Sequence, residues 1–167
     1  MTRRCRSGYH QMQNMITIGF LADYSDTIFT LAKWFRDQWP DYFAEWSQAE
    51  MEADFLEDAA RERLPIRLVA FESGELVGTI ILRENGNETL AEFQPELGGL
   101  YVVGSRRGQG IGSELVRAGM KVAGDLGFER VYATTTAAAG ILERLGWEFV
   151  KTAVYQDGEH ALYRCEL

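Results

Sequence analysis

Hydrophobic residues recur along this chain at two spacings, and each spacing predicts one kind of secondary structure. From Asp26 to Trp39, apolar residues fall three and four positions apart, the period of an amphipathic helix, and Pro40 ends the pattern. A second helix is expected to begin at Ser47, because its side chain can form a capping box with Glu50. The predicted apolar side of that helix consists of Phe55, Leu56 and Ala59.

β-Branched and aromatic residues gather in short runs elsewhere, and these runs predict strands. The first five runs are 16–21, 66–71, 76–82, 96–103 and 131–136. The segment from Glu72 to Glu75 is typical of a hairpin turn, and Asn85-Gly86 marks another turn. The paired glycines Gly98-Gly99 weaken strand pairing, so they predict a bulge or a close approach by another group.

The last part of the chain is expected to add two helices and a hairpin. A long helix should run from Ile111 to Leu126, with Gly127 in the C-cap position, and a short one from Ala137 to Leu145. Strands at 147–155 and 161–167 then form a hairpin about Asp157-Gly158.

The complete order, β-α-α-β-β-β-α-β-α-β-β, predicts a single α/β domain with a mixed sheet. We assign residues 15–167 to this domain. Residues 1–14 are polar and lack periodicity, so we expect them to be a flexible N-terminal extension.

Composition and charge then exclude several classes of function. The net charge of −8 disfavours nucleic-acid binding, which depends on Lys and Arg. No apolar run approaches the roughly 20 residues of a membrane span, and no secretory signal begins the chain, so a cytoplasmic protein is expected. Two histidines leave little material for a metal site or a serine triad. Cys5 and Cys165 are expected to be reduced thiols, although one disulfide between the chain ends is an alternative.

The clearest candidate site is a glycine-rich loop between a strand and a helix. Glycines at 108, 110 and 112 remove the Cβ atoms that would hold an anion away from the first amides of the helix. Arg106 and Arg107 are available as additional cations. The loop lacks the Gly-Lys-Ser/Thr ending of a Walker motif and the glycine spacing of a dinucleotide fingerprint. A pyrophosphate held by backbone amides is the ligand that this pattern favours.

The run from Arg107 to Gly112 resembles the Arg/Gln-x-x-Gly-x-Gly/Ala motif of the GNAT superfamily of acyl-CoA-dependent N-acyltransferases. The resemblance extends from about Met15 onward and includes Leu142 to Trp147, which is similar to the family's Tyr-Glu-Arg-Leu-Gly-Phe/Trp element. It implies a mixed, mostly antiparallel sheet of about six to seven strands with about four helices. The fourth and fifth strands of that sheet splay apart at a bulge, which Gly98-Gly99 suits.

The resemblance also implies acetyl-CoA as co-substrate, with no metal. Backbone groups of Leu100, Tyr101 and Val102 would pair with the pantetheine arm as an added strand would. The pyrophosphate would be held by the loop that follows. The residues implied there are Arg107, Gly108, Gln109, Gly110, Ile111, Gly112 and Ser113.

The chain departs from the family at the residue that often protonates the leaving thiolate. Leu142 occupies the position of that tyrosine, and the family's asparagine is replaced within Thr134-Thr135-Thr136. Three other tyrosines are candidates for the acid, namely Tyr101, Tyr132 and Tyr155, although each is also a plausible packing residue. Glu96 is the first candidate for the general base and Glu92 the second, with a surface carboxylate as the alternative for both.

The acceptor is expected to be an amine. Nine acids and one base lie between Asp37 and Glu62, which is either a solvated helix face or a field that attracts a cation. Aromatic residues crowd the same region, as core or as a cation-binding surface: Trp34, Trp39, Tyr42, Phe43 and Trp46. We therefore expect an N-acetyltransferase, monomeric or dimeric, that acts on a small cationic molecule or peptide. The alternatives are a non-catalytic acyl-CoA-binding module and an acetyltransferase of protein N-termini or lysines.

Overall fold

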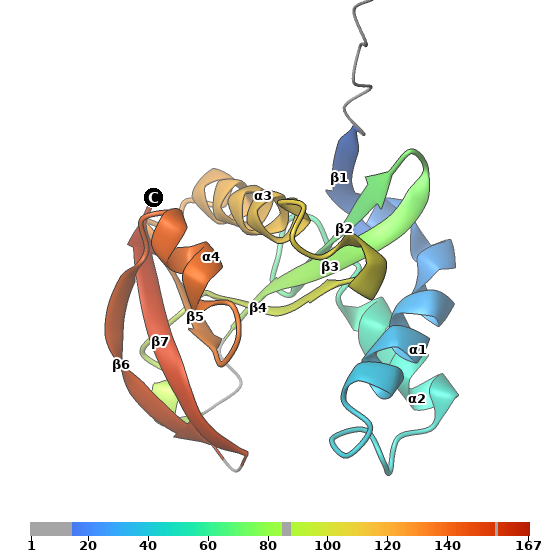
Figure 1. Ribbon diagram of the computed structural model, residues 1–167, viewed down its shortest axis with the longest axis horizontal. Helices are drawn as coiled ribbons and strands as arrows, with labels where there is room; N and C mark the ends of the chain where they lie inside the picture. Colours follow the sequence, from blue (N-terminus) through green and yellow to red (C-terminus); the bar gives the residue numbers. More distant parts are fainter. Residues whose placement is uncertain (1–14, 85–87, 156) are drawn as a thin grey trace, which may run out of the picture.

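The computed structural model describes residues 15–84, 88–155 and 157–167, and its framework is one mixed sheet (Figure 1). Within these ranges the strands follow the order β1-β2-β3-β4-β5-β7-β6. They are β1 (Ile16–Phe20), β2 (Ile66–Glu72), β3 (Glu75–Arg83), β4 (Glu96–Val102), β5 (Arg130–Thr135), β6 (Glu148–Tyr155) and β7 (Gly158–Glu166). All neighbours pair antiparallel except β4 and β5, which are parallel. The predicted fold class is confirmed.

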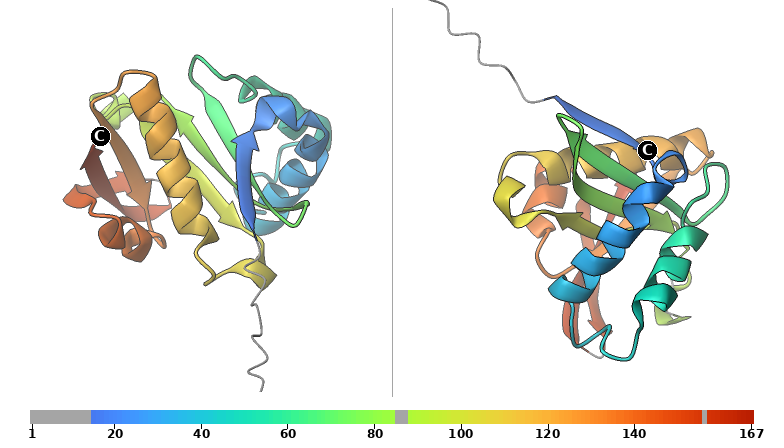
Figure 2. Two further views of the ribbon diagram at one scale, coloured as in Figure 1. Left: turned by 90° about the horizontal axis from the view of Figure 1, so that it is seen from above. Right: turned by 90° about the vertical axis from the view of Figure 1, so that its right-hand side faces the viewer.

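Helices cover both faces of this sheet (Figures 1 and 2). One pair, α1 (Ile28–Gln38) and α2 (Gln48–Glu57), packs on one face of the β1–β4 half. The other pair, α3 (Ile111–Asp125) and α4 (Ala139–Arg144), lies on the opposite face. A 3-10 turn at Ser25–Thr27 precedes α1, so the helix begins two residues later than the pattern predicts. No helix in the described ranges is long and apolar enough to cross a membrane.

The predicted capping box at the start of α2 is confirmed. The Glu50 amide donates to Ser47 Oγ at 3.1 Å, and the Ser47 amide donates to the Glu50 carboxylate at 2.8 Å. The predicted apolar side of the helix is wrong in two positions, because Leu56 is 59% exposed and Ala59 lies beyond the end of the helix at Glu57. Met51 and Phe55, four residues apart, form the buried stripe instead, and Leu56 follows Phe55 about 100° around the helix.

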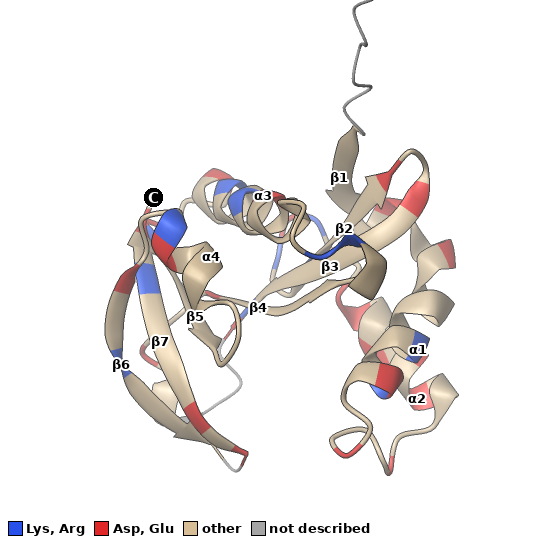
Figure 3. Cartoon of the chain, in the orientation of Figure 1, with Lys and Arg blue, Asp and Glu red and all other residues tan. Residues whose placement is uncertain are grey.

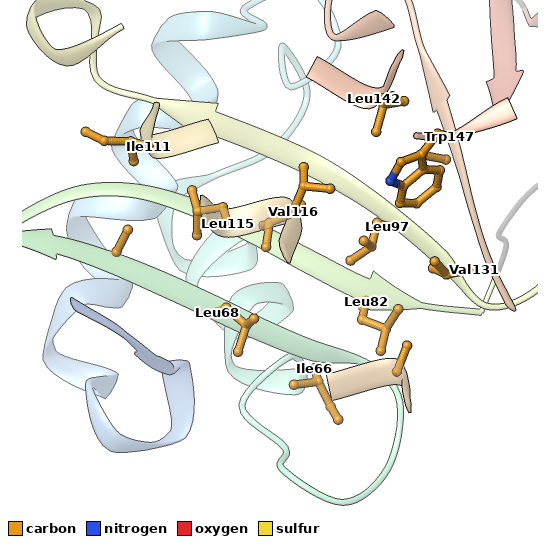
Figure 4. Packing of buried hydrophobic residues seen from close by; sticks show 14 of the residues in the cluster. Ile66, Leu68, Leu82, Leu97, Ile111, Leu115, Val116, Val131, Leu142 and Trp147 are labelled. Carbon is orange, nitrogen blue, oxygen red and sulfur yellow. The ribbon is translucent and has the colours of Figure 1, made fainter. Parts of the chain in front are cut away.

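Two hydrophobic cores lie on the two faces of the sheet. The larger core joins the sheet to α3 and α4, with Leu97, Leu115, Val131 and Trp147 among its members (Figure 4). Leu142 is only 3% exposed and lies beside Trp147 in this core. The smaller core lies under α1 and α2 and includes Leu31, Phe35, Met51, Phe55 and Val69.

A buried ion pair anchors the end of α2 to β2. The Arg67 Nε atom lies 2.8 Å from Asp58 Oδ2, and both residues are buried. The guanidinium carbon stands 4.6 Å from the centre of the Phe55 ring and 5.3 Å from that of Phe35. Burial raises the pKa of Asp58, although the charge of Arg67 opposes this shift. The pair thus fixes α2 against the sheet within the smaller core.

The expected bulge and splay are both present in β4. Thr79 of β3 pairs with Tyr101 whereas Ile81 pairs with Gly98, so one residue of β3 opposes two residues of β4 at Gly99-Leu100. On its other side β4 pairs with β5 only at Glu96 and Tyr132. Beyond that rung the two strands diverge (Figure 1).

Smaller differences concern element ends. The last strand begins at Gly158 rather than at residue 161, and Trp147 precedes β6 as a buried residue rather than starting it. The turn expected at Asn85-Gly86 and the expected extension at 1–14 lie outside the described residues, as does Cys5. Cys165 is a free, half-buried thiol whose pKa is raised by burial.

Candidate functional site

The glycine-rich loop leads directly into the first turn of α3. Gly108 and Gly110 have φ angles of +77° and +86°, a left-handed conformation that side chains rarely adopt. The first backbone hydrogen bond of the helix runs from the Glu114 amide to the Gly110 carbonyl, at 3.1 Å. The three amides before Glu114 therefore lack partners inside the helix and lie at its positive end. This arrangement can bind a phosphate group.

The third glycine of the loop acts differently from the sequence expectation. A Cβ atom on Gly112 would stand 3.0 Å from Ile141 Cδ1 of α4. Gly112 is buried, and its absent side chain lets α4 pack against the start of α3. This glycine brings two elements together, whereas Gly108 and Gly110 shape the loop.

The two arginines of the loop are already engaged. Arg106 forms ion pairs with Glu72 and Glu75 of the β2–β3 hairpin, so the expectation that it stands ready for an anion is wrong. Arg107 is exposed, and its Nε atom donates to the Val102 carbonyl at 2.8 Å. Its Nη2 atom donates to Gln38 Oε1 at 3.2 Å. A phosphate that takes the Nε or Nη2 donor would displace one of these contacts.

One edge of β4 is open next to this loop. The Val103 amide donates to the Val77 carbonyl at 2.9 Å, so residue 103 faces β3. Backbone groups alternate in direction along a strand, and those of Val102 consequently point into the gap between β4 and β5. The side chains of Leu100 and Val102 pack on the larger core and that of Tyr101 on the smaller one. An extended ligand can therefore pair with this edge through its polar groups.

Glu96, the first candidate base, lies at the rung where β4 and β5 separate. It is 3% exposed, and its Oε1 atom lies 3.5 Å from Arg83 Nη2. Gly98, two residues further, leaves the space for this pair, because a Cβ atom there would stand 3.0 Å from Arg83 Nη2 and 3.2 Å from Glu96 Oε1. Leu97 points into the larger core, so Glu96 faces the opposite side of the sheet, away from α3.

Thr134 joins Glu96 to one of the three candidate tyrosines. Its hydroxyl lies 3.3 Å from Glu96 Oε1, and the Tyr155 hydroxyl donates to Thr134 Oγ1, also at 3.3 Å. The side chains of Thr134 and Tyr155 are half-buried. A carboxylate, a hydroxyl and a phenol from three different strands thus form one hydrogen-bonded line.

The other candidate acids pack against aromatic rings, and the second candidate base is exposed. Tyr101 stacks on Trp34 with ring centres 5.2 Å apart, within the aromatic packing under α1. Tyr132 is buried, and its ring meets that of Phe93 edge-on at 5.4 Å. Glu92 is exposed in the turn before β4.

Acidic residues gather on α1, α2 and the loop between them (Figure 3). Trp34 and Phe43 pack against the smaller core, whereas Tyr42 is 76% exposed. Trp39 and Trp46 are each more than a third exposed. The aromatic cluster is therefore partly core and partly surface. Within the described ranges no three His, Cys, Asp or Glu residues gather as metal ligands.

The sequence alone missed Thr134, Arg83 and Gln38. Thr134 alternates with Val131 and Ala133, which lie in the larger core, so period-two alternation places it on the open face. The sequence contains this alternation, but it does not show which strand lies beside Thr134 or in which register. Arg83 and Gln38 contact residues 13 and 69 positions away in the chain, which no local pattern indicates.

Comparisons with known proteins agree with this geometry. A model of the acetyltransferase (GNAT) family matches residues 31–147. A GNAT-family acetyltransferase from Streptococcus pneumoniae superposes with a TM-score of 0.68 at 15% identity, covering 92% of this chain and 99% of that one. An aminoglycoside 6'-acetyltransferase type Ii gives a TM-score of 0.70 at 21% identity, with 90% and 96% covered. An aminoglycoside 6'-N-acetyltransferase complexed with coenzyme A gives 0.67 at 19% identity, with 90% and 96% covered. No curated protein matches the sequence significantly.

Proposed function

The chain belongs to the acetyltransferase (GNAT) family, and from this premise we propose that it transfers the acetyl group of acetyl-CoA directly to a primary amine of a small cationic molecule or peptide. One observation carries the proposal: a helix start with amides that lack partners inside the helix lies beside an open strand edge. A pyrophosphate and an extended amide-bearing arm need these two features side by side.

The open edge of β4 and the glycine-rich loop would each bind a different part of the cofactor. Backbone groups of Leu100 and Val102 would pair with the pantetheine arm, whereas those of Tyr101, which the expectation includes, face β3. The pyrophosphate would lie on the amides from Gly108 to Ser113, with Arg107 as the added cation. The thioester supplies an activated acyl group when bound, and the chain's own residues must provide acid and base.

Glu96 is the base that the geometry favours. A lysine-like amine has a pKa of about 10.4 and is mostly protonated at neutral pH, so it must lose a proton before it attacks. Glu96 faces the side of the sheet that α1 and α2 flank, at the point where the strands separate. A carboxylate there can accept the proton directly or through a water.

Tyr155 is the acid that we favour among the three candidates. It is hydrogen-bonded toward Glu96 through Thr134, whereas Tyr101 and Tyr132 pack against aromatic rings. Leu142 takes no part, since it is buried in the larger core beside Trp147.

The acidic helices support a cationic acceptor. Asp37, Asp41 and Glu45 are exposed near the exposed rings of Trp39 and Tyr42 along one short segment. Carboxylates and aromatic faces together attract organic cations. The fold is also shared with aminoglycoside acetyltransferases, which supports an amine-bearing small molecule over a protein.

Turnover on a panel of acceptors tests the activity. The purified chain is incubated with acetyl-CoA and polyamines, aminoglycosides, lysine peptides or neutral aromatic amines, and released thiol and acetylated mass are followed. We expect protein-dependent acetylation of at least one cationic amine. Tight acetyl-CoA binding without any acetylated product would instead support a non-catalytic acyl-CoA-binding module.

Substitution of Gly110 tests the cofactor site. Gly110→Glu places a carboxylate and a strained backbone where the phosphates would lie, so we expect coenzyme A binding to fall at least about 100-fold. Gly124→Glu adds the same charge near the other end of α3, at an exposed site with open space, and should bind normally. Calorimetry measures affinity and thermal melting checks the fold. Normal coenzyme A binding by a folded Gly110→Glu variant would refute this site.

A further inference from the structure

The hydrogen-bonded line from Glu96 to Tyr155 crosses the separation between the two halves of the sheet. Glu96 belongs to β4, Thr134 to β5 and Tyr155 to β6. Thr134 stands two residues beyond Tyr132, the residue that pairs with Glu96, so its side chain lies on the same face of the sheet as that of Glu96. Thr134 is the single connection in this line between the carboxylate and the phenol.

Both ends of the line are held by other side chains. Arg83 stands 3.5 Å from Glu96 Oε1, and Gly98 leaves room for that contact. At the other end, the ring of Tyr155 lies 4.4 Å from that of His160, centre to centre. Strand β7 lies between β5 and β6, and Tyr155 has to reach across it to meet Thr134. A shorter polar side chain at 155 would not span that distance.

We propose that Thr134 is a positioning residue that joins the base Glu96 to the acid Tyr155, so that the proton removed from the amine reaches the leaving sulfur along one internal path. This inference rests on the proposed function. Tyr155 would then act as the acid in place of the family's tyrosine, whose position Leu142 occupies.

The proton balance of the reaction closes along this line. The amine nitrogen bonds to the acyl carbon, the carbon–sulfur bond breaks, and its electron pair stays on sulfur. One proton passes from the amine nitrogen to Glu96. In the resting chain Tyr155 donates to Thr134 and Thr134 donates to Glu96. Once Glu96 carries the amine proton, both hydroxyls turn round: Glu96 donates to Thr134, Thr134 gives its own proton to Tyr155, and the phenol proton goes to the thiolate. All three side chains return to their starting state, and the products are an amide and a free thiol.

Four variants test the inference, with kcat and KM measured separately. Thr134→Val removes the hydroxyl at nearly constant shape, and we expect kcat to fall about 100-fold, within the range of general acid–base catalysis. The acceptor KM and coenzyme A affinity should change less than about twofold, since the proposed path gives the hydroxyl a role in proton transfer and not in binding. Thr134→Ser returns the hydroxyl and should restore kcat to within about fivefold of wild type. Thr152→Val, at an exposed site on β6, is the matched control and should keep wild-type kcat.

The fourth variant tests whether Thr134 and Tyr155 act as one unit. Tyr155→Phe alone should lower kcat about as much as Thr134→Val, and the double variant should be no slower than either by more than about twofold. Equal loss in Thr134→Val and Thr134→Ser, wild-type kcat in Thr134→Val, or multiplicative losses in the double variant would each overturn the inference. Absence of turnover in the wild-type chain would overturn the proposed function, and this inference with it.

Discussion

Arg107 holds two parts of the molecule at once. Its guanidinium reaches back over the ring of Tyr101, 5.6 Å from the ring centre, and bonds to the Val102 carbonyl and to Gln38 at the end of α1. Arg107 also directly precedes the glycine-rich loop in the sequence, so it is the cation closest along the chain to the loop amides. At the proposed pyrophosphate site, a phosphate and the end of α1 would therefore compete for one guanidinium.

This competition predicts opposite effects for two alanine substitutions. Arg107→Ala should weaken coenzyme A binding about tenfold or more, because a charge-assisted hydrogen bond contributes about 1.5–3 kcal/mol. Gln38→Ala frees the guanidinium from one of its two hydrogen bonds and should strengthen binding up to about fivefold, the equivalent of about 1 kcal/mol. Titration calorimetry at fixed salt measures both.

Arg117→Ala is the control, since that arginine lies on the exposed face of α3 and pairs with Glu114. It should bind coenzyme A like the wild type. Weakening by Gln38→Ala to the extent seen for Arg107→Ala would contradict the competition.

Single residues were the least predictable from sequence. The motif identified Arg107 and the loop glycines as candidate ligands of a pyrophosphate. It also suggested Arg106 as an anion-binding cation, but Arg106 forms ion pairs with the acids of a hairpin more than thirty residues away. Glu96 could be proposed from its strand. The hydroxyl beside it could not, because that contact depends on how two strands pair across a helix of 15 residues.

Among the elements, α2 depends on its first turn. Hydrogen bonds from Ser47, mainly that of its backbone amide, hold the pKa of Glu50 below its usual value. A lowered pKa in the folded state means that ionised Glu50 contributes stability above its unfolded pKa, and that this contribution is lost as pH falls through the folded pKa.

Glu50→Gln tests this linkage, because glutamine resembles the protonated acid. The variant should melt below the wild type at pH 7, where Glu50 is ionised, and the difference should disappear once the pH lies below the folded pKa. Thermal melts across this pH range give the result. Exposed Glu57, at the other end of α2, provides the control Glu57→Gln, which should not melt below the wild type at pH 7, because a negative charge there does not stabilise the helix. A constant difference at every pH would argue against the role of the charge.

The elements themselves were largely predictable. Apolar spacing located α1 and α3, and a cap signal placed the start of α2 at Ser47, because these signals act within one or two turns. The sequence pattern failed where tertiary packing decides which residues are buried, as at Leu56, which is 59% exposed. The sequence indicated the separation of β4 from β5 only through the glycine pair Gly98-Gly99, which predicted a bulge one residue before its observed place at Gly99-Leu100. The family resemblance implied the separation itself.

At the scale of the whole molecule, few strand contacts join the two halves of the sheet. The single rung between β4 and β5 is supplemented by α3, which packs on strands from both halves. A ligand bound in the gap would add contacts to both. Since it binds only the folded chain, it should stabilise that state by about 2.7 kcal/mol at 100 times its Kd.

Coenzyme A should accordingly raise the melting temperature by about 5–10 °C at that concentration, for a domain of this size. Scanning fluorimetry with increasing coenzyme A measures the shift, and hydrogen exchange should show protection along the free edge of β4. Gly110→Glu serves as the control without a shift. A comparable shift from a nicotinamide dinucleotide at equal concentration would count against a site selective for coenzyme A.

An open strand edge is ordinarily a route to aggregation, because its free N–H and C=O groups can pair with a strand of another molecule. Here the open edge of β4 lies inside the sheet, facing β5, rather than at the margins formed by β1 and β6. A neighbouring chain would have to thread a strand with all its side chains between two joined halves. A ligand with one slender arm meets no such barrier. The placement of the edge thus keeps it available to its ligand while withholding it from other copies of the protein.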